Sequence, residues 1–261
     1  MRSRMLAPCL LLGVLVGFAP SVVHAQAVPT LDHFECYRTT AQAPGVTVLL
    51  KDQFTVPGLP AALPFVVLNP VRFCNPVEKT TAAGVVTPIT NPDGHLEMYL
   101  TGPTVLKPSW NVIVKNQFGR QTLRAFSPEI LAVPSAKNDQ PPPAPDSLDH
   151  FQCYRAYGAS LTNFFKKTVV QLKDQFHTDP ETVTLMRPIA FCNPVEKRHG
   201  DPPIVTPVNH PDDHLVCYAF APTTFKGGAL ARNQFGGVPL PLGGADILCV
   251  PSQKLRFSVI F

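Results

Sequence analysis

The residues best suited to metal chemistry lie in the short segment "HPDDH" at positions 210–214. It places two imidazoles and two carboxylates within an expected loop, a set that could hold a divalent metal. The corresponding stretch earlier in the chain reads "NPDGH" and lacks the first histidine and the second aspartate. We therefore expect a solvated loop with one structural histidine, and neither a bound metal nor another cofactor. The weak metal candidates are His210, Asp212, Asp213 and His214.

A second set of side chains could bind sugars or peptides. Four tyrosines recur at matching places in the chain, and the single tryptophan lies in an alternating apolar segment. Aromatic faces can line a binding surface, but tyrosines packed beneath a connecting segment would show the same spacing, and this second interpretation is favoured. The weak binding candidates are Tyr37, Tyr99, Tyr154, Tyr218 and Trp110.

The sequence lacks the motifs of common catalytic centres. It contains no G-x-S-x-G, no H-E-x-x-H, no phosphate-binding glycine loop and no dinucleotide fingerprint. A blue-copper centre is set aside because no cluster of free Cys, His and Met closes the chain. We expect a protein that is not an enzyme. A secreted metal-dependent enzyme that uses the His210–His214 loop is the rival hypothesis.

The first 25 residues have the three parts of a secretory signal peptide: a basic start, an apolar run and small residues before Ala25. No other segment approaches the length of a membrane-spanning helix. Of the seven cysteines, six follow Ala25, and an even number in an exported chain indicates disulfides. We expect a secreted or periplasmic protein with no membrane span after removal of the signal peptide (1–25).

Four copies of one module carry these residues. Each begins with a phrase such as "DHFECYR", continues with a basic residue and "DQF" or "NQF", and ends with a phrase such as "FCNPVEK". The modules span 32–79, 94–137, 149–197 and 213–254. Modules one and three are the more similar pair, and modules two and four share "NQFG". The chain is therefore a doubled pair.

Cysteines fill the same two slots in three of the modules. Module two has Met98 in the first slot and Ala132 in the second, so both cysteines are missing together. Because a leftover thiol is a liability in an oxidising compartment, joint loss predicts that the two slots are bonded to each other. Free buried cysteines or bonds between modules are the alternative. The predicted disulfides are Cys36–Cys74, Cys153–Cys192 and Cys217–Cys249.

Two other repeated features are expected to be structural. The opening histidine occurs in all four modules, and a catalytic group is seldom needed four times, whereas a side chain that ties backbone groups together is. The Asp or Asn of each tripeptide suits a turn at the end of a strand, from which the phenylalanine returns to the core. The four histidines are His33, His95, His150 and His214.

Alternating apolar residues predict strands. In "WNVIVKNQF", Trp110, Val112 and Val114 share one face, and 30 prolines interrupt most windows long enough for a helix. Each module would supply three or four short strands, too few to bury a core alone. We predict an all-β protein with two tandem β-sandwich or partly open β-barrel domains, each built from two modules. A four-module solenoid is the alternative.

A proline-rich spacer, "NDQPPPAPDS" at 138–147, marks the predicted boundary between the two domains, 26–137 and 148–261. The tail Leu255–Phe261 also alternates and ends on phenylalanine, like the last strand of outer-membrane barrels. Since the body lacks the regular ten-residue amphipathic strands of such proteins, we expect the tail to add a strand to domain two.

These phrases resemble a family of uncharacterised exported bacterial repeat proteins, whose modules read roughly as D-H-x-x-C-Y, then K-D-Q-F or N-N-Q-F-G, then L-C-x-P-x-x-K. The resemblance covers nearly all of 31–254 and implies a repeat architecture but no function. Module two departs from it at Gly94, Met98 and Ala132.

The charge of the chain does not favour nucleic acid as a partner. The formal net charge is +4 and is spread along the sequence, whereas nucleic-acid binding needs a concentrated basic face. We expect a non-catalytic binding or cell-envelope module, with a glycan or an envelope component as the candidate partner. A purely structural surface protein is the alternative.

Overall fold

The structure is a computed structural model that describes residues 31–54, 58–103, 108–141, 147–159 and 165–260. The regular elements in these ranges are all strands, which confirms the predicted all-β class. The described part of the chain contains no helix long and apolar enough to cross a membrane. The predicted signal peptide and the centre of the proline-rich spacer lie outside the described residues.

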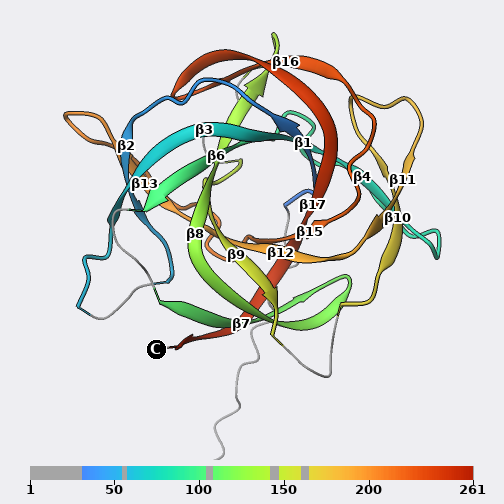
Figure 1. The fold of residues 1–261 in the computed structure, drawn as a ribbon, viewed down its shortest axis with the longest axis horizontal. Coiled ribbons are helices and arrows are strands. Elements are labelled where there is room, and N and C mark those ends of the chain that lie inside the picture. The colour runs from blue at the N-terminus through green and yellow to red at the C-terminus, as the bar shows by residue number, and fades with distance from the viewer. Residues whose placement is uncertain (1–30, 55–57, 104–107, 142–146, 160–164, 261) are drawn as a thin grey trace, which may run out of the picture.

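Eight strands form a closed ring, in which every strand pairs antiparallel with two neighbours (Figure 1). Each module supplies two of them, one from its opening phrase and one from its closing phrase. In order round the ring they are β1 (Phe34–Thr39), β3 (Leu63–Pro76), β6 (His95–Pro103), β8 (Gly119–Lys137), β9 (Phe151–Gly158), β12 (Arg187–Pro194), β15 (His214–Ala219) and β17 (Gly236–Ile260). Because β17 pairs with β1, the circuit is complete.

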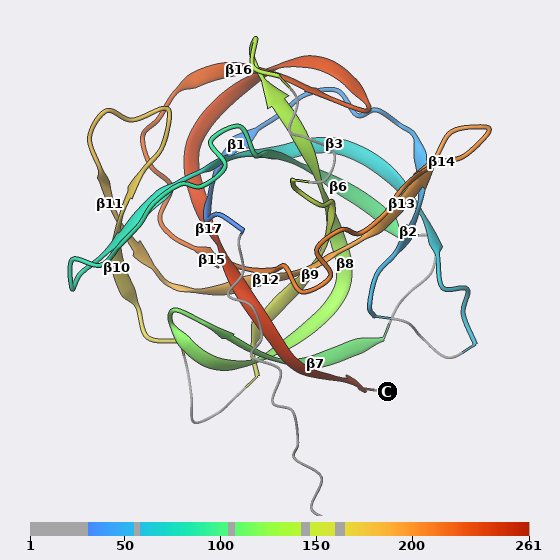
Figure 2. The same ribbon diagram turned by 180° about the vertical axis from the view of Figure 1, so that it is seen from behind.

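The other described strands lie around the outside of the ring, as two opposite views show (Figures 1 and 2). They come from the middle of each module and from the connectors. They are β2 (Thr47–Lys51), β4 (Glu78–Thr81), β5 (Val86–Thr87), β7 (Ser109–Asn116), β10 (Thr168–Lys173), β11 (Glu181–Leu185), β13 (Glu196–His199), β14 (Ile204–Thr206) and β16 (Gly227–Asn233). Of these, β11, β10, β4 and β5 form a separate four-stranded sheet.

The alternation of side chains along the ring strands divides the buried residues into two layers. Side chains that face into the ring, including the cysteines, form a small central cluster. Those that face outward, including the four repeated tyrosines, pack beneath the outer strands together with Trp110. The ring therefore has a core on each of its two faces.

Strands from the two halves of the chain share one sheet. Where the halves meet in the ring, β17 pairs with β1 and β8 pairs with β9. Outside the ring, β13 pairs with β2, and the predicted tail strand, which is the end of β17, pairs with β7 of the first half. The two-module halves are present, but the structure joins them instead of leaving separate tandem domains. The physical reason is that each half alone would expose strand edges that the other half covers.

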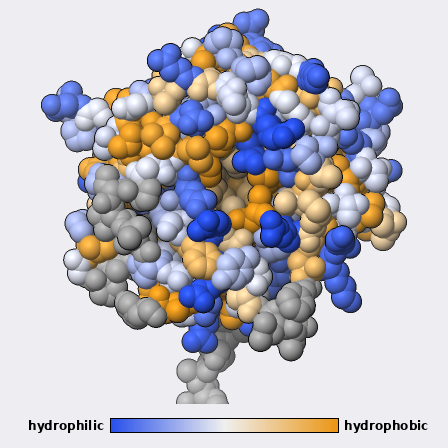
Figure 3. All heavy atoms as spheres, viewed as in Figure 1, coloured by the Kyte–Doolittle hydropathy of each residue, from blue (hydrophilic) through white to orange (hydrophobic). Residues whose placement is uncertain are grey.

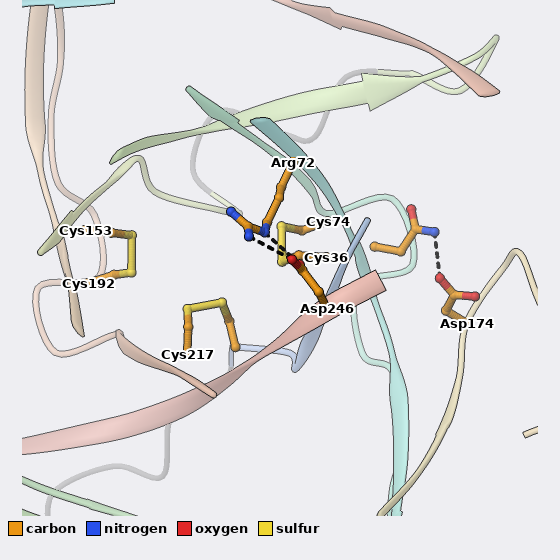
Figure 4. The surroundings of a disulfide bond; sticks show 10 residues. Cys36, Arg72, Cys74, Cys153, Asp174, Cys192, Cys217 and Asp246 are labelled. Carbon is orange, nitrogen blue, oxygen red and sulfur yellow. Dashed lines mark hydrogen bonds and ion pairs between the residues drawn. A yellow bond between two sulfur atoms is a disulfide. The ribbon is translucent and has the colours of Figure 1, made fainter. Parts of the chain in front are cut away.

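The three disulfides are cross-strand bonds inside the ring (Figure 4). Each links two cysteines that lie directly opposite each other on neighbouring antiparallel strands, with Cα–Cα distances of 3.9–4.0 Å. In module two the same register places Met98 opposite Ala132. The bonds are those that the repeats predict, Cys36–Cys74, Cys153–Cys192 and Cys217–Cys249.

Candidate functional site

Modules one and three cap each other outside the ring, which means that the tripeptide of each module covers and binds the repeated tyrosine of the other. Asp52 of module one accepts a hydrogen bond from the Tyr154 hydroxyl at 2.6 Å, and Asp174 of module three accepts one from Tyr37 at 2.9 Å. The amide of Asn75 donates to Asp174 at 2.8 Å, and the matching amide of module three donates to Asp52 at 3.2 Å. Each aspartate also accepts the backbone N–H two residues further on, which is the predicted turn.

Modules two and four cap each other in the same way, with an asparagine in place of each aspartate. Asn116 of module two donates to Tyr218 at 2.9 Å and to Ser252 at 3.0 Å. Asn233 of module four donates to Tyr99 at 2.9 Å and to the matching serine at 3.1 Å. Each aspartate therefore accepts from an amide donor, whereas each asparagine donates to hydroxyls, and Asn233 also donates to the Glu97 carboxylate at 2.8 Å.

The aromatic candidates do not form an accessible binding surface. All five side chains are at most 3% exposed, because the outer strands and the tripeptides cover them. Trp110 stacks on Phe54 with ring centroids 4.7 Å apart. The weak binding assignment is corrected to packing beneath a connecting segment for Tyr37, Tyr99, Tyr154, Tyr218 and Trp110.

The opening histidines are buried polar side chains with partners from other segments. His33 Nε2 lies 3.2 Å from Gln117 Oε1. His150 Nε2 lies 2.9 Å from the side-chain amide of Gln234. Burial lowers the pKa of all four histidines, to about 4 for His95 and to about 3 for the other three. They are neutral at pH 7, which suits a structural role.

We expect the free energy of unfolding to decrease as the pH falls from about 6.5 to about 4. The folded-state pKa of the four histidines lies well below the ordinary value near 6.5, so the unfolded chain binds more protons in this window. Three carboxylates act in the opposite direction, because burial raises the pKa of Glu97 to about 7, that of Glu35 well above its ordinary range and that of Asp213 above its ordinary value. The four histidines outnumber these three carboxylates, so we expect a net decrease in the free energy of unfolding across the window.

Urea denaturation at several pH values across this window measures the loss. The variant His150→Gln removes one titrating group and keeps a polar side chain beside Gln234, so it should reduce the proton uptake on unfolding by about one. A stability that stays constant across the window would contradict the presence of neutral buried histidines.

The segment "HPDDH" does not gather its four side chains into a site. His214 is buried on β15, whereas the side chain of His210 is 40% exposed and its backbone N–H donates to Asp149 at 2.7 Å. Asp212 is exposed and Asp213 is half-buried. Among the described residues, the group with the geometry to hold a metal is a different one, formed by Glu35, Asp174 and His177.

The candidate functional site is a pocket at the centre of the ring, with a volume of about 220 Å³. Figure 3 shows the central hollow with hydrophobic residues inside and hydrophilic residues around it. Cys153 and Cys217 line it, so two of the disulfides adjoin the pocket. The large apolar side chains of the lining are Val71, Met98, Leu100, Ile130, Ile189 and Ile247.

Charged side chains surround this pocket. Arg72 donates two hydrogen bonds to Asp246, at 2.8 and 2.9 Å, a bidentate pair that holds the guanidinium in place (Figure 4). Arg155 lies 3.4 Å from Glu129, and these two side chains are 64% and 44% exposed. The site is therefore an apolar hollow with two arginine–carboxylate pairs beside it, in which the remaining guanidinium N–H groups could be shared with the anionic end of an apolar molecule.

The pocket residues occupy positions that the sequence singles out only indirectly. Arg72 and Ile247 each lie two residues before a second-slot cysteine, and Arg155 lies two residues after a first-slot cysteine. Strand alternation would place all three on the face of the cysteines. That this face encloses a hollow follows only from the closure of the ring.

Comparison with known proteins identifies the repeat. A family model described as a repeat of unknown function (DUF7450) matches residues 95–251, more than half of the chain. The match runs from the opening histidine of module two into the closing phrase of module four. No match was found among curated proteins or among solved structures. The repeated phrases and the family model agree, and the chain belongs to this family of repeats of unknown function.

Proposed function

We propose that this chain is a secreted, non-catalytic binding protein whose ligand occupies the central pocket. The observation that carries the proposal is the apolar hollow inside the ring, with Arg72 and Arg155 beside it. The three disulfides support an oxidising location, outside the cell or in the periplasm. The polar side chains repeated in every module form hydrogen bonds between modules. Because they serve this structural purpose, they do not argue for a catalytic role, and the pocket is left as the feature that supports a binding function.

The chemistry of the pocket favours a short apolar chain with an anionic end. Its volume of about 220 Å³ is below the roughly 300–1,000 Å³ typical of drug-sized ligands. A glycan fits less well, because the tyrosine faces on which a sugar would stack are buried. An acyl group of an envelope component has the required apolar body, and a carboxylate or phosphate would meet the arginines.

Octanoate is a suitable probe, and calorimetry should show its saturable binding to the full chain. Ile130→Trp enlarges a side chain in the lining and should weaken binding at least about tenfold. Leu230→Trp changes an exposed position on β16 and serves as the matched control, with unchanged affinity. Octylamine, which has the same body and the opposite charge, should bind more weakly than octanoate.

Thermal melting of both variants verifies that they are folded. Equal octanoate affinity in the wild type and in Ile130→Trp would remove the pocket from consideration. Failure of the wild type to bind octanoate would overturn the proposed ligand class, as would tighter binding of octylamine.

A further inference from the structure

One junction between modules one and three concentrates ionisable groups. Glu35, Asp174 and His177 bring their potential ligand atoms within 4.8 Å of one another. His177 Nδ1 lies 3.2 Å from Asp174 Oδ1, and its Nε2 lies 3.8 Å from Glu181 Oε2. Glu35 is on ring strand β1, and Asp174 and His177 are in the segment that joins the outer strands β10 and β11.

Within this cluster, the buried carboxylate of Glu35 has no nearby group that offsets the cost of its charge. Its side chain is fully buried, and neither carboxylate oxygen accepts a well-directed hydrogen bond from the described residues. The neighbouring hydroxyl of Tyr37 donates to Asp174 at 2.9 Å, and its proximity to Glu35 only moderates the pKa of that carboxyl. Burial, together with the charges of Asp174 and Glu181, raises the pKa of Glu35 well above its ordinary range. A buried carboxylate without partners is costly, and a cation would offset that cost.

The three matching junctions never place two carboxylates together. The corresponding pairs are Gln152 with Asp52, Glu97 with Asn233, and Val216 with Asn116. In the fourth junction, Glu35 of module one faces Asp174 of module three. The tripeptide that begins at Asp174 is followed by His177, whereas the other three tripeptides are followed by threonine or glycine. The other three junctions therefore pack without two facing carboxylates and a histidine. Packing alone does not explain why the junction of Glu35 has all three.

We propose that Glu35, Asp174 and His177 bind a zinc ion. Two carboxylates and one imidazole are ligands that Zn²⁺ accepts in a four-coordinate site, whereas Ca²⁺ and Mg²⁺ prefer oxygen ligands. The side chains of His177 and Glu181 are 22% and 30% exposed, which gives the ion a route from solvent. A water molecule would occupy the fourth position of such a site. The ion would neutralise the facing carboxylates and tie module three to the ring strand of module one.

Calorimetry with the full chain, freed of metal by a chelator and titrated with Zn²⁺, tests this proposal. We expect one bound ion and a higher melting temperature. Glu35→Gln copies the neutral residue of module three, and His177→Thr copies the residue that follows "DQF" in module one. Each variant should bind Zn²⁺ at least about tenfold more weakly. Glu97→Gln and His210→Ala are the controls, and both should keep the wild-type affinity.

Each of the other outcomes overturns the proposal. Wild-type affinity in Glu35→Gln and His177→Thr would place the ion elsewhere, and a selective loss in His210→Ala would assign it to the "HPDDH" loop. If Glu35 and Asp174 share a proton instead, Zn²⁺ leaves the wild-type melting temperature unchanged. In that case Glu35→Gln raises the melting temperature without metal, because it removes the second carboxylate.

Discussion

The N-terminal half of the chain, residues 26–137, is expected to remain unfolded when it is produced without residues 148–261, and the reverse is expected as well. Separation exposes the edges of β1 and β8, which pair with β17 and β9 in the intact ring. It also removes the contacts of Phe54 with Tyr154 and Phe191. Loss of one buried large aromatic costs roughly 3–5 kcal/mol, so several such losses exceed the stability of a typical domain, roughly 5–15 kcal/mol.

Amide NMR spectra of each half should show narrow dispersion, and mixing the halves should restore the spectrum of the intact chain. The control is a full-length chain with a protease site inserted within residues 142–146. Its halves fold together before cleavage and should stay associated afterwards. A cooperative melt and a dispersed spectrum from either half alone would contradict this expectation, because that half would then form a core without the shared ring.

Replacement of one disulfide by the pair that module two uses is the second change with a large expected effect. The double variant Cys36→Met, Cys74→Ala copies Met98 and Ala132, which occupy the same opposed positions. The bond closes a loop with a sequence separation of 38, for which chain-entropy estimates give about 3–4 kcal/mol. We expect the free energy of unfolding to decrease by this amount while the strand pairing is retained.

Urea denaturation measures the loss, and the reverse exchange is the matched control. Met98→Cys with Ala132→Cys places two thiols opposite each other, and the resulting bond should raise the free energy of unfolding by a comparable amount. A loss below about 1 kcal/mol in Cys36→Met, Cys74→Ala would show that loop closure in the unfolded chain contributes little to this protein.

The disulfides, the turns and the strand class could be predicted from the repeats. The joint absence of both cysteines from module two identified the bonded slots, because two residues opposed across a ladder are lost as a unit. The turn at Asp52 and its equivalents follows from the tendency of Asp and Asn to accept the N–H two residues on. Alternation in segments such as "WNVIVKNQF" was sufficient for the all-β class.

The candidate sites were not accessible in the same way. Arg72, Arg155 and Ile247 come from three different modules, and they surround one hollow only because the ring closes. Glu35 lies on the outward face of β1, and nothing near it in the sequence indicates a second carboxylate. Its neighbours Asp174 and His177 arrive from module three, through a fold that brings Tyr37 to Asp174 across 137 residues.

By itself, the sequence determined the repetition of one module, the disulfide partners and the all-β class, because these depend on short-range spacing and on residues that are lost together. Only the tertiary structure decided that the halves share one ring and that the tyrosines belong to a core. The physical reason is that strand edges and tyrosine hydroxyls must find partners, and here the other half of the chain supplies them. Each tripeptide forms a hydrogen bond with a tyrosine between 102 and 137 residues away, and no local sequence pattern specifies which tyrosine it is.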